Sequence, residues 1–256
     1  MAAASPAPAP ASAGASSEEV VKSKRWLPLE SNPDLMNKYA ESLGFPTAMY
    51  QFHEIFSTED WALEMIPAPV IAVVFLYPIK DSTEAHRAAE KERIAKDGQE
   101  VSDKLYYTKQ TIGNACGTIG LLHAIANVSD LTGGDVPLAP GKWWHSFVSK
   151  TKDMSADDKA AALEADEELE EEHKKTATDE SAAVLETEDV YTHFIAFVQK
   201  DGCLYELDGR KDSPINHGAS SKDSVLKDSM KVMREFMARD EGEIRFTMLA
   251  LAPAAE

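Results

Sequence analysis

The sequence predicts an α+β fold in which a largely antiparallel central sheet is flanked by helices. Residues 67–78, PAPVIAVVFLYP, form an apolar run rich in β-branched residues between prolines, which is typical of a strand buried on both faces. Residues 192–208 contain two strand-like runs separated by Asp201-Gly202, a strong hairpin signal. Because the predicted helices and strands do not alternate as in repeated βαβ units, we expect mainly antiparallel pairing.

The length and composition fit one folded domain over residues 23–256. The chain has 256 residues, of which 43% are hydrophobic and 27% charged, so it can bury a full core. Residues 1–22 are rich in Ala, Pro and Ser, lack aromatic residues, and hold no basic residue before Lys22. Such a composition cannot bury enough surface to order itself, so we expect a disordered tail there.

The charge and the cysteine count exclude several classes of protein. A net charge of −18 argues against nucleic acid and anionic membranes as partners, and favours a partner with a basic face. Two cysteines cannot form a disulfide framework, and they cannot build a four-ligand zinc site without several nearby histidines. The sequence contains neither an 18-residue apolar window nor a signal-peptide pattern. We therefore expect a cytoplasmic or nuclear monomer with free thiols, and neither a metal nor a cofactor.

Cap residues delimit the elements along the chain. Asn32 at an N-cap, Pro33 at the first helical position and Gly44 just past the end predict one well-punctuated helix. An acidic stretch with little apolar content predicts a long loop over residues 173–189. The other predicted elements are a short strand at 24–30, a helix at 57–66 with a Ser/Thr cap, a polar helix at 83–97 stopped by Gly98, helices at 142–150, from Ser155 and at 221–239, and a strand at 244–252.

The predicted hairpin brings two polar residues together. If Asp201-Gly202 are the central residues of a type I′ turn, the residues flanking the turn face each other. The same register pairs His193 with Arg210, and Ile195 with Asp208. His193 and Asp208 are then diagonal neighbours on one face, with Cβ atoms about 7 Å apart. A carboxylate at that distance can hold an imidazole N–H, which is half of a Cys-His-Asp arrangement.

The stretch KQTIGNACGTIGLLHAIANV, residues 109–128, offers the other half. Cys116 opens a predicted buried helix, and a helix N-terminus favours the thiolate, lowering the pKa of the thiol below about 8.5. Gln110 precedes it and could donate its side-chain N–H to an oxyanion, beside the backbone N–H of Cys116. The sequence therefore predicts a nucleophilic cysteine with a histidine base.

Each of these signals has a structural alternative. A lone buried cysteine such as Cys116 is more often inert core, and Cys203, within a strand, is better explained as structural filler. His123 competes for the role of base, but its place two turns into the helix of Cys116 favours a structural histidine. The other histidines have no companion carboxylate in a defined geometry: His53, His86, His145, His173 and His217.

Three stretches together make the sequence similar to the ubiquitin carboxyl-terminal hydrolases of the small single-domain type. They are RWLPLESNP, KQTIGNACGTIGLLHAIAN and HFIAFV…GCLYELDGRK…PINHG, and the resemblance extends from about residue 24 to 251. It implies a papain-like cysteine peptidase core and a knotted backbone. It also implies Cys116 as nucleophile, His193 as general base and acid, Asp208 as the residue that orients it, and Gln110 as oxyanion donor.

The resemblance further implies a substrate and a partner. The enzyme would release small adducts or short peptides from the C-terminal glycine of ubiquitin, whose basic face suits an acidic protein. A Nedd8-type modifier, or ubiquitin binding with little turnover, are the alternatives. A crossover loop is expected within about residues 170–190. The expected ubiquitin contacts are Pro28, Leu29, Glu30, Ser31, Asn32 and Pro33, together with Glu243, Ile244, Arg245 and Phe246.

Overall fold

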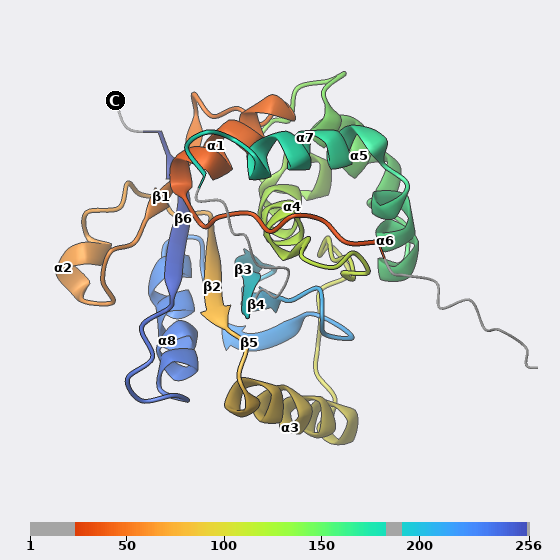
Figure 1. The fold of residues 1–256 in the computed structure, drawn as a ribbon. Coiled ribbons are helices and arrows are strands. Elements are labelled where there is room, and N and C mark those ends of the chain that lie inside the picture. Colours follow the sequence, from red (N-terminus) through yellow and green to blue (C-terminus); the bar gives the residue numbers. More distant parts are fainter. Residues whose placement is uncertain (1–23, 183–190, 255–256) are drawn as a thin grey trace, which may run out of the picture.

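A six-stranded sheet forms the centre of the molecule (Figure 1). The structure, a computed structural model, describes residues 24–182 and 191–254. Every neighbouring pair of strands is antiparallel, in the order β1-β6-β2-β3-β4-β5, which confirms the predicted fold class. The strands are β1 (Tyr50–Glu54), β2 (Ala72–Pro78), β3 (Thr192–Lys200), β4 (Cys203–Leu207), β5 (Ile215–Ala219) and β6 (Thr247–Pro253).

Helices cover both faces of this sheet, as the apolar run of β2 predicts. Ala72 and Val74 face the larger core, which includes the buried helix α4, whereas Val73 and Phe75 face a second core beneath α8. Figure 1 shows α8 on one side of the sheet and α4 on the other. Alternate side chains of one strand thus supply two cores, so β2 is buried on both faces, as expected from its continuous apolar sequence.

The predicted helices are present with small shifts of their ends. Asn32 caps the first helix by accepting hydrogen bonds from the backbone N–H groups of Asp34 and Leu35, and Gly44 follows the helix with a φ of 93°. The helices are α1 (Pro33–Ser42), α2 (Asp60–Leu63), α3 (Asp81–Asp97), α4 (Cys116–Val128), α5 (Trp143–Thr151), α6 (Ala156–Glu164), α7 (Glu167–Ala177) and α8 (Val225–Met237), with a short 3₁₀ helix at Asp130–Thr132.

The acidic region differs most from the prediction. We expected a helix from Ser155 and then a loop over 173–189, but the chain breaks near Asp166 and α7 continues to Ala177. Leu169 and His173, four residues apart, are the buried residues of α7 and give it one packed face. Asp166 caps its N-terminus. The expected crossover loop therefore begins only after α7, and its residues 183–190 lie outside the described part of the chain.

Smaller corrections concern the N-terminal region. Residues 24–30 are not a strand, because Arg25 makes only an isolated parallel bridge to Gly113. The short helix α2 begins after Glu59 and has no side-chain cap. The sequence also missed β1 and β5, the two edge strands. The predicted tail, residues 1–22, lies outside the described residues. Residues 183–190 also lie outside them, so the chain cannot be followed through that segment and the backbone knot stays a prediction.

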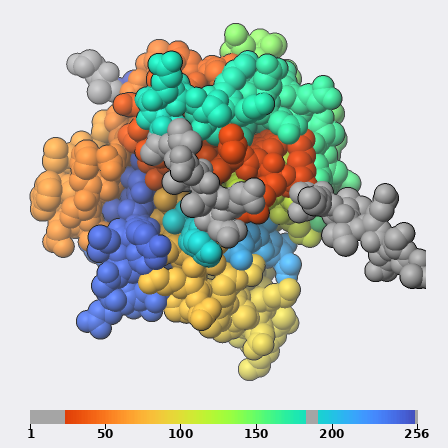
Figure 2. All heavy atoms as spheres, viewed as in Figure 1, coloured from red at the N-terminus to blue at the C-terminus, as the bar shows by residue number. Residues whose placement is uncertain are grey.

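The segment 24–33 packs beneath the acidic helix. In Figure 2 its red atoms lie directly below the teal atoms of α7. The His173 imidazole fixes this contact: Nε2 lies 2.6 Å from the Leu27 carbonyl oxygen, and the ring packs on Trp26 with centroids 4.4 Å apart.

Among the described helices, none is long and apolar enough to cross a membrane.

Candidate active site

Cys116 is the first residue of α4, as predicted. All residues of this helix are buried, and 7% of Cys116 is exposed. Two glycines let the helix approach its neighbours: a Cβ on Gly117 would lie 3.0 Å from the Leu29 side chain, and one on Gly120 would lie 3.4 Å from that of Phe194. Among the described residues no side chain caps the N-terminus of α4, and the backbone N–H of Gly117 is one of the groups that lower the pKa of the thiol.

The imidazole and the carboxylate also meet as predicted. His193 Nε2 lies 2.6 Å from Asp208 Oδ1, and 2% of the histidine and none of the aspartate is exposed. The turn at Asp201-Gly202 has positive φ at both residues, 47° and 83°, and pairs Lys200 with Cys203. The register argument is confirmed on these points.

The strand pairing itself is shorter than expected. The β3–β4 ladder ends at Ala196 and Leu207, so the predicted pairs of His193 with Arg210 and of Ile195 with Asp208 do not form. The chain turns away from β3 immediately after β4. His193 and Asp208 still share a face, because the side-chain alternation of both strands carries on for the few residues beyond the last pair.

Asp208 instead begins a tight turn, residues 208–211. The Lys211 N–H donates to the Asp208 carbonyl at 3.0 Å, and the Arg210 N–H donates to Asp208 Oδ1 at 2.8 Å. The Tyr107 hydroxyl donates to the carbonyls of Asp208 and Lys211, at 2.8 and 2.6 Å. A polar side chain bonding its own backbone two residues on is a common way to fix such a turn. The orientation of the Asp208 carboxylate therefore depends on this turn.

The three side chains shift one another's ionisation. Burial opposes ionisation of Cys116, but the His193 imidazole and the backbone N–H groups of Phe194 and Gly117 bring the pKa of the thiol below its ordinary value. Burial would lower the pKa of His193, but Asp208 and Cys116 raise it to about 9. The buried Asp208 has a pKa well below its usual range because of His193, the Arg210 N–H and the charge of Lys211. The arrangement favours a thiolate–imidazolium pair at neutral pH.

Gln110 lies beside the aspartate turn. Its backbone N–H donates to the Gly209 carbonyl at 2.8 Å, and a Cβ on Gly209 would lie 3.0 Å from the Gln110 Cβ. The side-chain Nε2 donates one hydrogen to the Ile112 carbonyl at 3.1 Å, which leaves its second hydrogen for another acceptor. Gln110 Oε1 is buried and has no hydrogen-bond partner within residues 24–182 and 191–254. Glycine after Asp208 is thus required so that the glutamine can pack closely against the turn.

The competing residues take structural places. The buried His123 is paired with backbone: Nε2 lies 3.1 Å from both the N–H nitrogen and the carbonyl oxygen of Thr108, and Nδ1 lies 3.3 Å from the Leu207 carbonyl oxygen. Burial lowers its pKa to about 4, so it is neutral at pH 7. Cys203 is a free, half-buried thiol at the hairpin turn. Among residues 24–182 and 191–254, no group of His, Cys, Asp and Glu side chains has a metal-binding arrangement.

The two segments expected to contact ubiquitin lie next to each other. The Ser31 hydroxyl donates to Thr247 Oγ1 at 3.0 Å. Thr247 directly follows the segment 243–246, so this hydrogen bond links the two segments. Ile244 is 86% exposed, whereas the Phe246 ring stacks on Phe75, with centroids 5.9 Å apart. Leu29 is buried against Gly117, so its side chain supports the nucleophile's helix.

The remaining residues of these segments have intramolecular partners as well. The Glu243 carboxylate forms ion pairs with Lys80 and Arg245, with N–O distances of 2.8 and 2.7 Å. The Asn32 side chain caps α1. Pro28, Glu30 and Pro33 are half-buried. The most exposed side chains of the two segments are therefore Ile244 and Arg245, both in the second segment.

The fold and this geometry define a cysteine hydrolase. A thiol at a helix N-terminus, an imidazole beside it and a carboxylate behind the imidazole form the arrangement of a thiol peptidase. A family model for "Ubiquitin carboxyl-terminal hydrolase, family 1" matches residues 26–238 of the chain. The chain therefore belongs to this family of cysteine peptidases.

Individual relatives are similar over nearly their whole length. "Ubiquitin carboxyl-terminal hydrolase 3" of Arabidopsis thaliana is 42% identical over 243 residues, which cover 93% of this chain and 98% of the relative. "Ubiquitin carboxyl-terminal hydrolase isozyme L1" of Homo sapiens is 42% identical, over 89% and 98% of the two chains. The fold is similar to that of the Trichinella spiralis UCH37 catalytic domain bound to ubiquitin vinyl methyl ester, with a TM-score of 0.69, 22% identity and coverage of 90% and 96%.

Proposed function

We propose that this chain hydrolyses the bond after the C-terminal glycine of ubiquitin and releases small adducts or short peptides. One observation carries the proposal: a buried His193–Asp208 pair, 2.6 Å apart, lies beside the Cys116 thiol at the start of α4, and the imidazole lowers the pKa of that thiol. Membership of the family supports ubiquitin as the substrate, as do the names of the relatives and the ubiquitin adduct in the Trichinella spiralis structure.

The first half of the reaction forms an acyl-enzyme on Cys116. The Cys116 thiolate attacks the carbonyl carbon of the terminal glycine, and the negative charge moves to the carbonyl oxygen. The free N–H of the Gln110 side chain and the backbone N–H of Cys116 donate hydrogen bonds to this oxyanion. The His193 imidazolium then gives its proton to the departing amine or thiol, and the C–N or C–S bond breaks.

The second half releases ubiquitin. Neutral His193 accepts a proton from water, which attacks the thioester carbon. The C–S bond breaks, ubiquitin leaves as the carboxylic acid and loses its proton to solvent, and Cys116 returns to a thiolate beside protonated His193. Asp208 stays ionised throughout, holds the ring through Nε2 and so keeps the other ring nitrogen directed at the reacting atoms.

The surface of residues 28–33 and 243–246 is the proposed ubiquitin contact. The Ser31–Thr247 hydrogen bond joins its two parts, and exposed Ile244 offers an apolar anchor. The net charge of −18 suits a basic partner, so association should be steered electrostatically. We therefore expect kcat/KM to fall as salt is raised, chiefly through slower association.

A thiol-reactive ubiquitin tests this function directly. A ubiquitin whose C-terminus carries an electrophile should label Cys116, as mapped by mass spectrometry of the adduct. Cys116→Ala should abolish both labelling and hydrolysis of a ubiquitin C-terminal reporter, because no other thiol is aligned with His193. Cys203→Ala is the matched control and should retain full activity. Hydrolysis that survives in Cys116→Ala would refute the proposal.

A Nedd8-type modifier is the alternative substrate. A ratio of kcat/KM values measured side by side on ubiquitin and Nedd8 reporters decides between them. A third outcome, tight ubiquitin binding with negligible turnover, would assign the chain to ubiquitin binding instead. The lowered pKa of Cys116 favours turnover, because a thiol held only for binding needs no ionisation.

A further inference from the structure

Helix α3 buries a carboxylate. This 17-residue helix lies at the lower edge of the molecule in Figure 1, and its buried residues are Thr83 and Glu90. A carboxylate out of water is costly unless it is paired. Glu90 Oε2 lies 2.5 Å from Lys211 Nζ, and 8% of each side chain is exposed. The central part of an otherwise polar helix is thus attached to the turn that carries Asp208.

Lys211 has a second buried partner on the sheet. Its ammonium lies 2.5 Å from Glu206 Oε1 on β4, and the other oxygen of Glu206 pairs with His217 Nε2 at 3.0 Å. Burial would lower the pKa of Lys211, but Glu206 and Glu90 raise it above its ordinary value. The lysine is therefore a fixed positive charge between helix and sheet.

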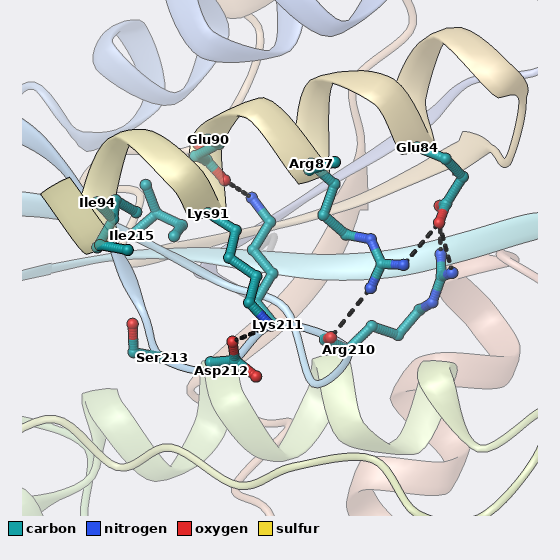
Figure 3. A pocket seen from close by; sticks show the side chains of 12 residues that line it. Glu84, Arg87, Glu90, Lys91, Ile94, Arg210, Lys211, Asp212, Ser213 and Ile215 are labelled. Atoms are coloured by element: carbon teal, nitrogen blue, oxygen red, sulfur yellow. Dashed lines mark hydrogen bonds and ion pairs between the residues drawn. The ribbon is translucent and has the colours of Figure 1, made fainter.

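Apolar packing between α3 and the turn is incomplete. A cavity of about 410 Å³ separates the helix from residues 210–215, and its lining includes Ala88, Ile94 and Ile215 (Figure 3). The figure shows charged side chains crossing from the helix to the turn. Arg210 pairs with Glu84 at 3.0 Å, but its side chain is 26% exposed. Ionic contacts therefore hold the turn to the helix, and the Lys211–Glu90 pair is more buried than the Arg210–Glu84 and Lys91–Asp212 pairs.

We propose that Lys211, held by Glu90 and Glu206, is a positioning residue for the hydrolysis at Cys116. Asp208 lies one residue beyond the end of the β3–β4 ladder, so strand alternation sets its face but no ladder pair holds its backbone. Lys211 closes the same turn through its backbone, and Asp208 Oδ2 is buried with no hydrogen-bond partner among the described residues. The lysine fixes the turn, its charge favours ionised Asp208, and through Asp208 it aligns His193. This inference rests on the proposed function.

Lys211→Met tests the inference through two readouts. We expect kcat on a ubiquitin reporter to fall about tenfold with KM within about twofold, because a slightly misplaced Asp208 affects the chemistry and not the ubiquitin contact. We also expect slower alkylation of Cys116 by iodoacetamide at pH 7, since a poorly held imidazolium stabilises less thiolate. Lys211→Arg keeps the charge and should recover most of both rates. A lower Tm with unchanged kcat and alkylation would overturn the proposal.

A double variant keeps the test valid if Lys211→Met does not fold. Replacing Lys211 and Glu90 together by Met removes the buried pair without leaving Glu90 alone, while Glu206 keeps its contact with His217, and such exchanges often preserve stability. It should fold and still show the loss of kcat; full activity would refute the positioning role. Lys91→Met is the matched control, because the Lys91–Asp212 pair links the same elements with side chains 72% and 69% exposed.

The two readouts separate this inference from the proposed function. Alkylation of Cys116 needs no ubiquitin, so it reports on the Cys116–His193 pair even if the reporter is not cleaved. A wild-type protein that fails on ubiquitin but alkylates faster than Lys211→Met would reject the substrate and keep the role of Lys211. If wild type cleaves ubiquitin and Lys211→Met has the same alkylation rate and the same kcat, the substrate is kept and the role of Lys211 is rejected.

Discussion

Two buried histidines near Asp208 have opposite electrostatics. His193 touches the carboxylate at 2.6 Å, and its pKa is raised to about 9. His123 is equally buried, but its ring nitrogens meet only the backbone of Thr108 and Leu207, and burial lowers its pKa to about 4. Burial is common to both, so the direct carboxylate contact decides which histidine holds a proton at neutral pH.

Replacing His193 should have the largest effect. In His193→Gln we expect kcat to fall about 10³-fold or more, because both the proton carrier and the partner of the thiolate are lost. The measurement is single-turnover hydrolysis of a ubiquitin reporter. His123→Gln is the comparison, and we expect its kcat within about threefold of wild type. Similar losses in both variants would contradict the assignment of His193 as the base.

Removing the negative charge of Asp208 should bring the pKa of His193 closer to that of His123. Asp208→Asn should lower kcat about 10²-fold, and the pKa of His193 should move down from about 9. Iodoacetamide alkylation of Cys116 followed against pH should then require higher pH, since the thiolate loses its charged partner. An alkylation profile that does not change would show that Asp208 has no influence on the pair.

The neutral histidine should control acid stability. A base whose pKa is about 4 in the folded state and about 6.5 in the unfolded state makes stability full above pH 6.5 and lowers it as the pH falls toward 4. His123→Leu leaves the Thr108 N–H buried and unpaired, which costs about 1–3 kcal/mol at pH 7. The gap in unfolding free energy between wild type and variant should therefore narrow between pH 6.5 and 4, as measured by urea denaturation. A constant gap would mean that His123 does not titrate in this range.

Local sequence rules predicted the pieces of this site well. The dipeptide Asp201-Gly202 sets the hairpin register, and the alternation of side chains then places His193 and Asp208 on one face. The sequence also correctly predicted that an apolar helix begins at Cys116. Both inferences depend on neighbours in the chain, for which periodicity and turn chemistry are strong signals.

The same rules failed where packing between distant segments decides. Edge strands β1 and β5 each bury one side chain, Phe52 and Ile215, so they lack a clear alternating pattern. The end of helix α7, residues 173–177, looked like the start of a loop because its charges conceal a narrow buried face. The buried pair of Glu90 and Lys211 gave no signal at all, since a charged residue in sequence is read as solvated surface.

The early end of the β3–β4 ladder has a consequence for folding. Cys116 belongs to a helix, His193 to a strand and Asp208 to a turn. His193 and Asp208 are distant in sequence from Cys116, and both lie beyond the last hydrogen-bonded pair of the hairpin. Contacts between distant segments form late and slowly during folding. The rate at which hydrolysis returns after dilution from denaturant should thus follow the closing of the core around α4, and it should lag behind formation of the hairpin.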